Sequence, residues 1–145
     1  MQRYLPSGHP ERLPETDPIA YDLFADAYNA HWGCFSLTWL KVFGFLVGWR
    51  LPSEARVLDL CCGTGQIAAE LGARGYPVVG LDGSRGMLLH ARVNAPDARL
   101  FQGDARCFGL CPVFDAVVCM FDSLNHLLSA DELGAAFKSV YHCLV

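Results

Sequence analysis

The apolar residues of this chain fall into short runs separated by amphipathic stretches. Runs rich in β-branched and aromatic residues predict four strands, at residues 55–60, 76–81, 98–102 and 114–121. Between the first three runs, apolar residues recur at helical spacing over 66–74 and 84–94, which predicts two helices. Apolar strands that alternate with helices are typical of a parallel sheet covered on both faces. The pattern therefore predicts an α/β, doubly wound fold.

The N-terminal third has a different pattern. Residues 1–16 carry three prolines and no apolar periodicity, which predicts a flexible arm. The run IAYDLFADAYNAHW (19–32) has apolar residues on two opposite helical faces, so we expect a helix covered on both sides. A second apolar run predicts another helix over 36–49. The expected organisation is an arm, N-terminal helices over 17–50 and a core over 51–145.

The last predicted helix runs from Asp131 to Leu144. Ser129 and Glu132 form a capping box in front of its apolar positions. Such a helix normally returns the chain to a further parallel strand, but the sequence ends at Val145. We therefore expect the core to be incomplete at its C-terminal side.

Composition narrows the classes of function. The chain has 145 residues, 52% of them hydrophobic, which suits one compact domain. Its formal net charge of -4 and the absence of Lys or Arg runs argue against a nucleic-acid partner. The most apolar stretch, 39–49, is too short for a membrane span and contains Lys41. We expect a cytoplasmic protein without a membrane segment.

The seven cysteines do not form a recognisable ligand pattern. Cys61 and Cys62 are adjacent, the number is odd, and no secretory leader opens the chain, so we expect reduced thiols. Cys107 and Cys111 lack a second pair of Cys or His ligands, so we predict buried, inert cysteines there and no metal site.

The segment VLDLCCGTGQIA (57–68) carries the strongest chemical signal. A buried strand runs into a glycine turn and then into a helix, which makes a site for an anionic or polar group. Gly63, Gly65 and Ala68 also fit the dinucleotide fingerprint, with Asp82 near the distance of the acid that binds an NAD ribose. An NAD-dependent oxidoreductase is therefore one alternative, and a turn that only connects strand and helix is another.

Further carboxylates favour a different ligand. Asp59 lies inside the end of the first strand, where a dinucleotide site normally needs an apolar residue, and a carboxylate there suits a cationic or amino-bearing ligand. Gly103, Asp104 and Ala105 follow the third strand, at the same sheet edge where ligands bind in open α/β folds.

With these segments in order, the sequence resembles the class I S-adenosylmethionine-dependent methyltransferases over about residues 18–145. VLDLCCGTG, VVGLDGSRGML, LFQGDARCF and FDAVVCMFDSLNHLL are similar to four successive motifs of that family. The resemblance implies a Rossmann-like sheet of seven strands in the order 3-2-1-4-5-7-6, of which this sequence supplies the first four. It also implies S-adenosyl-L-methionine as cofactor and transfer of its methyl group to an acceptor.

The resemblance also assigns roles to single residues. Asp59 would face the methionyl amino end, Gly63 and Gly65 would give the cofactor room, and Asp82 would accept both ribose hydroxyls. Further cofactor contacts are implied for Asp104 and Ala105 at the adenine, Phe121 over the methionine portion, and Tyr21 and Tyr28 as a lid.

Two positions depart from the family's pattern. Cys61 stands where the first glycine of the turn is most often found, and Gly83 replaces a bulky apolar residue that commonly contacts the adenosine. We expect Met87 or Phe108 to supply that contact.

The acidic, compact chain favours a small-molecule methyl acceptor, and His126 is a candidate general base. A non-catalytic binding or interaction module is the further alternative. The fourth strand would be an open edge, and its run AVVCMF (116–121) has no charge, proline or glycine. We therefore expect that these residues either self-associate there or are the ordered part of a longer chain, and that alone they bind cofactor weakly and do not turn over.

Overall fold

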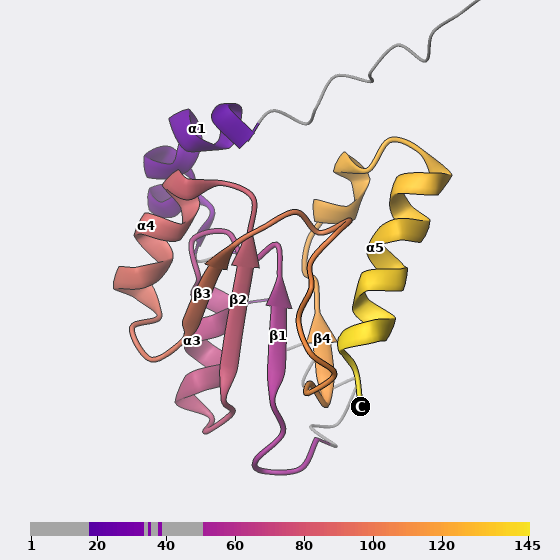
Figure 1. The fold of residues 1–145 in the computed structure, drawn as a ribbon. Helices are drawn as coiled ribbons and strands as arrows, with labels where there is room; N and C mark the ends of the chain where they lie inside the picture. Colours follow the sequence, from indigo (N-terminus) through magenta and orange to yellow (C-terminus); the bar gives the residue numbers. More distant parts are fainter. Residues whose placement is uncertain (1–17, 34, 36–37, 39–50) are drawn as a thin grey trace, which may run out of the picture.

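The computed structural model describes residues 18–33, 35, 38 and 51–145. Its centre is a parallel sheet of strands β1 (Val57–Leu60), β2 (Val78–Asp82), β3 (Arg99–Gln102) and β4 (Ala116–Val118). The strands lie in the order β3-β2-β1-β4, which confirms the predicted order (Figure 1). The predicted arm and the 36–49 helix lie outside the described residues, apart from Thr38.

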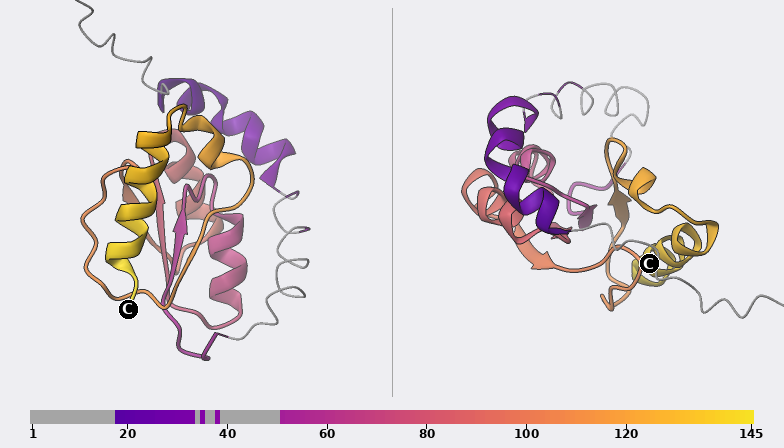
Figure 2. Two further views of the ribbon diagram at one scale, coloured as in Figure 1. Left: turned by 90° about the vertical axis from the view of Figure 1, so that its right-hand side faces the viewer. Right: turned by 90° about the horizontal axis from the view of Figure 1, so that it is seen from above.

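Helices cover both faces of this sheet. Helices α3 (Gln66–Ala73) and α4 (Arg85–Asn94) lie on one face, and α5 (Ala130–Cys143) lies on the other (Figures 1 and 2). Helix α1 (Pro18–His31) packs on α4, and a short 3₁₀ helix, η1 (Ser123–His126), precedes α5. Helix α5 begins with the predicted capping box, since the Ser129 hydroxyl accepts from the Glu132 N–H.

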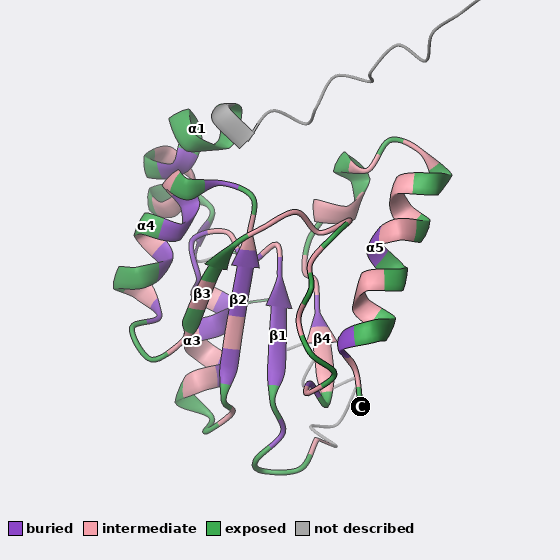
Figure 3. Cartoon of the chain, viewed as in Figure 1, coloured by how far each residue is buried: buried purple, intermediate pink, exposed green. Residues whose placement is uncertain are grey.

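Two apolar clusters hold these layers together. The first fills the space between the sheet and α3, where Val57, Val78 and Val118 meet Ile67 and Leu71. The second lies on the opposite face. It joins Leu58, Leu60 and Leu81 of the strands to Phe114 and to Cys143 at the end of α5. Strand β1 is buried along its whole length because it contributes to both clusters (Figure 3).

Two predictions about packing need correction. Helix α1 is not covered on both sides, because Leu23 is 85% exposed and Phe24 is 41% exposed. It contacts α4 through polar side chains described below, and Asn29 and Tyr21 also reach α3 and η1. Strand β4 spans Ala116–Val118 rather than 114–121, because the chain leaves the sheet toward Phe121, whose φ is +62°.

The last helix is only partly covered. Phe137 and Tyr141 of α5 are 57% and 77% exposed, whereas Val140 and Leu144 contact the second cluster. Within the described residues, β4 pairs with β1, and Phe114 just before β4 forms a parallel bridge with Leu144 after α5.

The turn between β1 and α3 is fixed by contact with α4. Gly65 has φ +85°, and a Cβ added there would lie 2.9 Å from both Cα and Cβ of Ala91. A side chain at Gly65 would therefore meet α4. The glycine is needed for close packing of turn and helix.

Replacing Gly65 or Gly75 by alanine should separate the effect of this packing on stability from the effect of backbone strain. Both have positive φ, but a Cβ at Gly75 meets nothing within 4 Å. Gly75→Ala should lower the free energy of unfolding by about 1 kcal/mol. Gly65→Ala should lower it by about 2 to 4 kcal/mol, since overpacking against α4 adds to the strain. Urea unfolding measures both values, and equal losses would contradict the packing of the turn.

Candidate functional site

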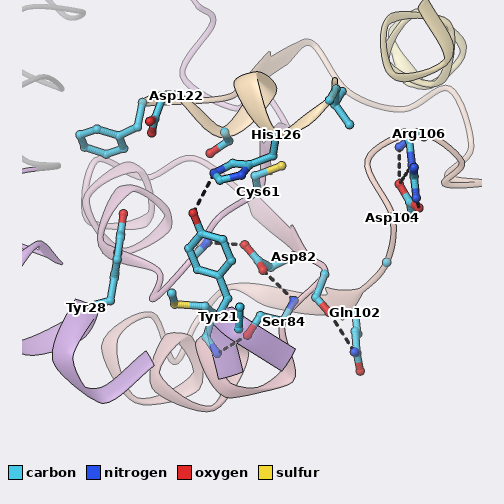
Figure 4. A pocket seen from close by; sticks show the side chains of 18 residues that line it. Tyr21, Tyr28, Cys61, Asp82, Ser84, Gln102, Asp104, Arg106, Asp122 and His126 are labelled. Atoms are coloured by element: carbon cyan, nitrogen blue, oxygen red, sulfur yellow. Dashed lines mark hydrogen bonds and ion pairs between the residues drawn. The ribbon is translucent and has the colours of Figure 1, made fainter. Parts of the chain in front are cut away.

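A cavity of about 740 Å³ opens at the carboxyl ends of the strands. Its wall is formed by α1, the glycine turn after β1, the ends of β2 and β3, and the segment around η1 (Figure 4). Ligand sites in open α/β sheets lie at this edge, and the volume is in the range of small-molecule sites.

The glycine turn contains three residues with positive φ. Besides Gly65, these are Cys61 with φ +58° and Gly63 with φ +53°, and the latter two line the cavity. Left-handed backbone is uncommon for a side-chain-bearing residue. Cys61 stands where a glycine was expected, and its backbone takes a conformation that glycine adopts easily.

Asp82 connects this turn to the next one. Its Oδ2 accepts from the Gly63 N–H (2.8 Å) and its Oδ1 from the Ser84 N–H (2.9 Å). Burial raises the pKa of this carboxyl, and the two backbone hydrogen bonds oppose that effect. Each carboxylate oxygen can accept more than one hydrogen bond. Asp82 therefore holds the turn and keeps acceptor capacity toward the cavity that it lines.

Asp59 is buried beneath the same turn. It is 2% exposed, and its Oδ2 has no hydrogen-bond partner. Burial raises its pKa well above the ordinary value, and nearby Cys119 and Asp82 add to the rise. A second cavity of about 30 Å³ lies beside it, lined also by Tyr28 and Gly63. A buried carboxylate oxygen without a partner is costly, and a positively charged or amino group is a partner that would suit the free Oδ2 of Asp59.

Tyrosines of α1 and a histidine of η1 lie across the cavity from Asp82. The Tyr21 hydroxyl is hydrogen-bonded to Nε2 of His126 (2.8 Å), and the two rings meet edge to face with centroids 5.4 Å apart (Figure 4). Burial raises the pKa of Tyr21, followed by the charge of Asp122. Tyr28 lies next to Gly63, since a Cβ built there would be 3.9 Å from the tyrosine ring.

Polar side chains position α1 over this cavity. The Asp22 carboxylate accepts from the Ser84 hydroxyl (2.5 Å) and from the Gly86 N–H (2.7 Å), at the N-terminus of α4. These hydrogen bonds lower the pKa of Asp22. Because Asp22 is next to Tyr21, the contact with Ser84 also fixes where that tyrosine lies.

Two further side chains of α1 continue the polar contact. Asp26 pairs with Nε2 of His90 (2.8 Å). The Asn29 side-chain oxygen accepts from the side-chain amides of Gln66 (3.0 Å) and Asn94 (2.7 Å). The contacts recur at helical spacing, so they occupy one face of α1.

Asp104 is held by a neighbouring cation. The Arg106 guanidinium donates to both Asp104 oxygens and to Oε1 of Glu132 (2.6 Å), which lowers the pKa of both carboxyls. Glu132 belongs to the capping box of α5, so this network ties the loop after β3 to that helix.

The structure brings most of the predicted site residues into the wall of the larger cavity. They are Tyr21, Tyr28, Cys61, Gly63, Asp82, Gly83, Met87, Asp104, Phe121 and His126. Asp59 lies in the smaller cavity, and Gly65 and Ala105 line neither. Ala105 and Phe108 instead pack against the second apolar cluster, which leaves Met87 as the residue of the expected pair that lines the cavity.

Sequence reasoning missed several polar residues of this wall. Ser84, Gln102, Arg106 and Asp122 all line the cavity. The sequence contains a signal for two of them. Arg106 is a lone cation two residues after Asp104, and Ser84 follows a strand-ending Asp-Gly pair in the position of a helix N-cap. Asp22 shows no such signal, because its role arises from packing between distant segments.

The cysteine prediction is corrected in part. Cys107 and Cys111 are exposed, not buried, because they lie on the irregular segment between β3 and β4. All cysteines in the described part of the chain are free thiols. Within those same ranges, no cluster of three or more metal-ligating side chains occurs. The helices seen there are also too short or too polar to cross a bilayer.

A family model described as "Methyltransferase domain" matches residues 57–145, more than half of the chain. The chain belongs to the methyltransferase-domain family. The match covers the strands, the glycine turn and the cavity floor described above, so the Rossmann-like sheet and its edge cavity are those of a methyltransferase domain.

The relatives of this methyltransferase domain include enzymes that act on amino sugars. A dTDP-3-amino-3,4,6-trideoxy-α-D-glucopyranose N,N-dimethyltransferase of Streptomyces venezuelae is 45% identical over 94 residues, which is 65% of this chain and 40% of that protein. The chain thus spans about two fifths of this curated relative.

Solved structures give the same picture. The structure of Streptomyces venezuelae DesVI matches with 38% identity and a TM-score of 0.66, over 90% of this chain and 54% of the other. S-adenosylmethionine-bound CalS10, an amino pentose methyltransferase from Micromonospora echinaspora, matches with 35% identity and a TM-score of 0.69. That match covers 82% of this chain and 52% of the other.

Asp59→Asn should stabilise this methyltransferase domain at neutral pH. A carboxyl whose pKa is higher in the folded state than in the unfolded state destabilises the fold once it ionises. The gain should be absent below about pH 3, grow as the pH rises above the ordinary carboxyl range, and reach about 1 to 3 kcal/mol once Asp59 is ionised. Urea unfolding across pH measures it. Exposed Asp97→Asn is the control, and a loss of stability in Asp59→Asn would contradict the burial argument.

Proposed function

We propose that this chain forms the cofactor-binding part of an S-adenosyl-L-methionine-dependent methyltransferase that acts on a small-molecule amine. The observation that carries this proposal is the pair of carboxylates at the glycine turn, Asp59 fully buried and Asp82 partly buried. Asp59 has one oxygen without a hydrogen-bond partner, and Asp82 is held by backbone N–H groups with capacity to spare. The S-adenosylmethionine-bound relative and the N,N-dimethyltransferase relative support the choice of cofactor and reaction.

The residues present fit this cofactor. Asp82 is placed to accept from two vicinal hydroxyls of a ribose, because its two oxygens are held side by side. The unpartnered Oδ2 of Asp59 lies next to the cavity floor and would balance the amino group of the methionine portion. Gly63 lets the backbone approach the ligand closely, and Met87 offers an apolar contact in the wall.

When bound, the cofactor supplies a methyl group on a positively charged sulfur, which is already an activated leaving group. The chain's own contribution is to hold donor and acceptor in line and to keep water out. Tyr21, Tyr28 and Phe121 cover the cavity in this scheme.

Asp104 has a modified role in this proposal. Both of its oxygens already accept from Arg106, so its capacity to accept from an adenine amino group is reduced. Ala105 does not line the cavity. We therefore assign Asp104 and Arg106 together to the adenine end, as a fixed ion pair along which the base lies.

The acceptor end lies around Tyr21 and His126. An amine must lose a proton to become a nucleophile, and a histidine is suited to take it near neutral pH. The hydrogen bond with the Tyr21 hydroxyl orients the His126 ring. Asp122 also lines this part of the cavity and would attract a protonated amine.

The NAD-dependent alternative is disfavoured by Asp59. A buried, unpartnered carboxylate beneath the turn would repel a pyrophosphate, whereas it suits a cationic amino acid portion. A titration comparing S-adenosylhomocysteine with NADH separates the two ligands. A non-catalytic binding module is the remaining alternative. Such a module would bind S-adenosylhomocysteine but would transfer no methyl group.

Asp82→Ala should weaken binding of S-adenosylhomocysteine by about 2 to 4 kcal/mol, or about 30-fold to 1,000-fold. The change removes the acceptor for the ribose hydroxyls and also releases the Gly63 N–H. Asp82→Asn keeps one acceptor oxygen and should lose less. Isothermal titration measures both, with exposed Asp97→Ala as the control. Unchanged affinity in Asp82→Ala would overturn the assignment of this carboxylate.

His126→Ala should lower the rate of methyl transfer by about 10²-fold to 10⁴-fold while cofactor affinity changes little. Tyr21→Phe should have a smaller effect, because it removes the hydrogen bond to Nε2 and keeps the ring contact. The measurement is transfer of a labelled methyl group to amino-sugar nucleotides by the full-length protein. A wild-type rate in His126→Ala would exclude the histidine as the base.

A further inference from the structure

Two cysteines come together where strands β1 and β4 end. In the parallel register Asp59 lies opposite Val118, so Cys119 follows opposite Leu60. Cys61 is therefore one residue further along its chain than the position opposite Cys119. Neighbouring strands are about 4.8 Å apart, and disulfide-bonded residues have Cα atoms about 4.4 to 6.8 Å apart. The register therefore brings the two backbones to a separation at which a disulfide can form.

The two thiols lie on the same face of the sheet. Both side chains pack against the second apolar cluster, which lies between the sheet and α5. In a regular strand, Cys61 would point to the face opposite that of Leu60. With φ +58° it leaves strand geometry, and its side chain packs on the face of Cys119. The unusual backbone of Cys61 thus places two thiols together.

The two thiols have different settings. The neighbouring Cys61 thiol lowers the pKa of Cys119, whereas Cys119 and burial raise the pKa of Cys61. Neither residue is fully buried. Cys61 lines both cavities, so a small oxidant in the cavity can reach the pair from the Cys61 side (Figure 4).

We propose that Cys61 and Cys119 form a reversible modification site at the cavity wall that Cys61 lines, where a peroxide converts the two thiols into a disulfide. One of the two thiols gives up its proton and attacks a peroxide oxygen. The O–O bond breaks, a sulfenic acid forms, and the released hydroxide takes that proton to become water. The sulfur of the other cysteine then attacks the sulfenic sulfur. The S–O bond breaks, an S–S bond forms, and the hydroxide leaves as a second water with the proton of the second thiol.

The modification would act on the turn that carries the binding groups. Cys61 lies two residues from Asp59 and two from Gly63. A disulfide pulls its sulfur toward β4, and a displacement of about 1 Å at such a site has large effects. The cross-link itself does not depend on the proposed function, whereas its effect on cofactor binding rests on it. If the cofactor binds better to the protein with reduced thiols, then bound cofactor must in turn disfavour oxidation of these thiols.

The test uses a background variant in which Cys34, Cys107 and Cys111 are replaced by serine. It is treated with hydrogen peroxide, alkylated and digested, and the peptides are analysed by tandem mass spectrometry. We expect a cross-linked pair two hydrogens lighter than the separate peptides, joined at Cys61 and Cys119 and released by dithiothreitol. Cys61→Ser and Cys119→Ser should each abolish it. Cys62→Ala, at the neighbouring thiol, should retain it.

Binding of S-adenosylhomocysteine to the cross-linked protein should be weaker by about tenfold or more. The ligand should in turn slow the cross-linking reaction, and reduction should restore affinity. A cross-link that survives in Cys61→Ser or Cys119→Ser, or oxidation that yields only sulfinic acids, overturns the proposal. If the cross-link forms but the reduced protein does not bind S-adenosylhomocysteine, the thiol pair stands and the proposed function fails.

Discussion

The site depends on one buried carboxylate that bonds to two turns at once. Asp82 ends β2 and accepts from Gly63 of one turn and from Ser84 of the next. Ser84 in turn caps α4 and donates to Asp22 of α1. The sheet edge, the glycine turn and the overlying helix are therefore linked in series through a single side chain. Burial makes these hydrogen bonds hard to replace with water, so the geometry of the cavity is set before any ligand enters.

Much of the core could be predicted from the sequence because it follows from local pattern. The runs around Leu58, Val79 and Val117 have the composition of buried strands, and alternation with helices leads to a parallel sheet. The capping box at Ser129 was placed correctly to the residue, and the predicted strand 76–81 overlaps β2 at Val78–Asp82. Hydrophobic periodicity and helix caps depend on residues that are close together in the chain, so both can be recognised in a single sequence.

The parts that could not be predicted depend on contacts between distant segments. Gly65 reads as a ligand-binding glycine, yet its missing side chain leaves room for Ala91 of α4. The sequence of α1 suggests apolar cover on both faces, but its contact with α4 is made by Asp22, Asp26 and Asn29. Which face of a helix is used depends on what lies opposite, and this information is not in the helix itself.

The polar contact between α1 and α4 has a thermodynamic consequence. The heat-capacity change of a transition follows the apolar area that it exposes, and the groups that separate here are mainly carboxylates, amides and an imidazole. These polar contacts therefore contribute little to the heat-capacity change of releasing α1 from α4, unlike the apolar contacts that hold the helices on the sheet.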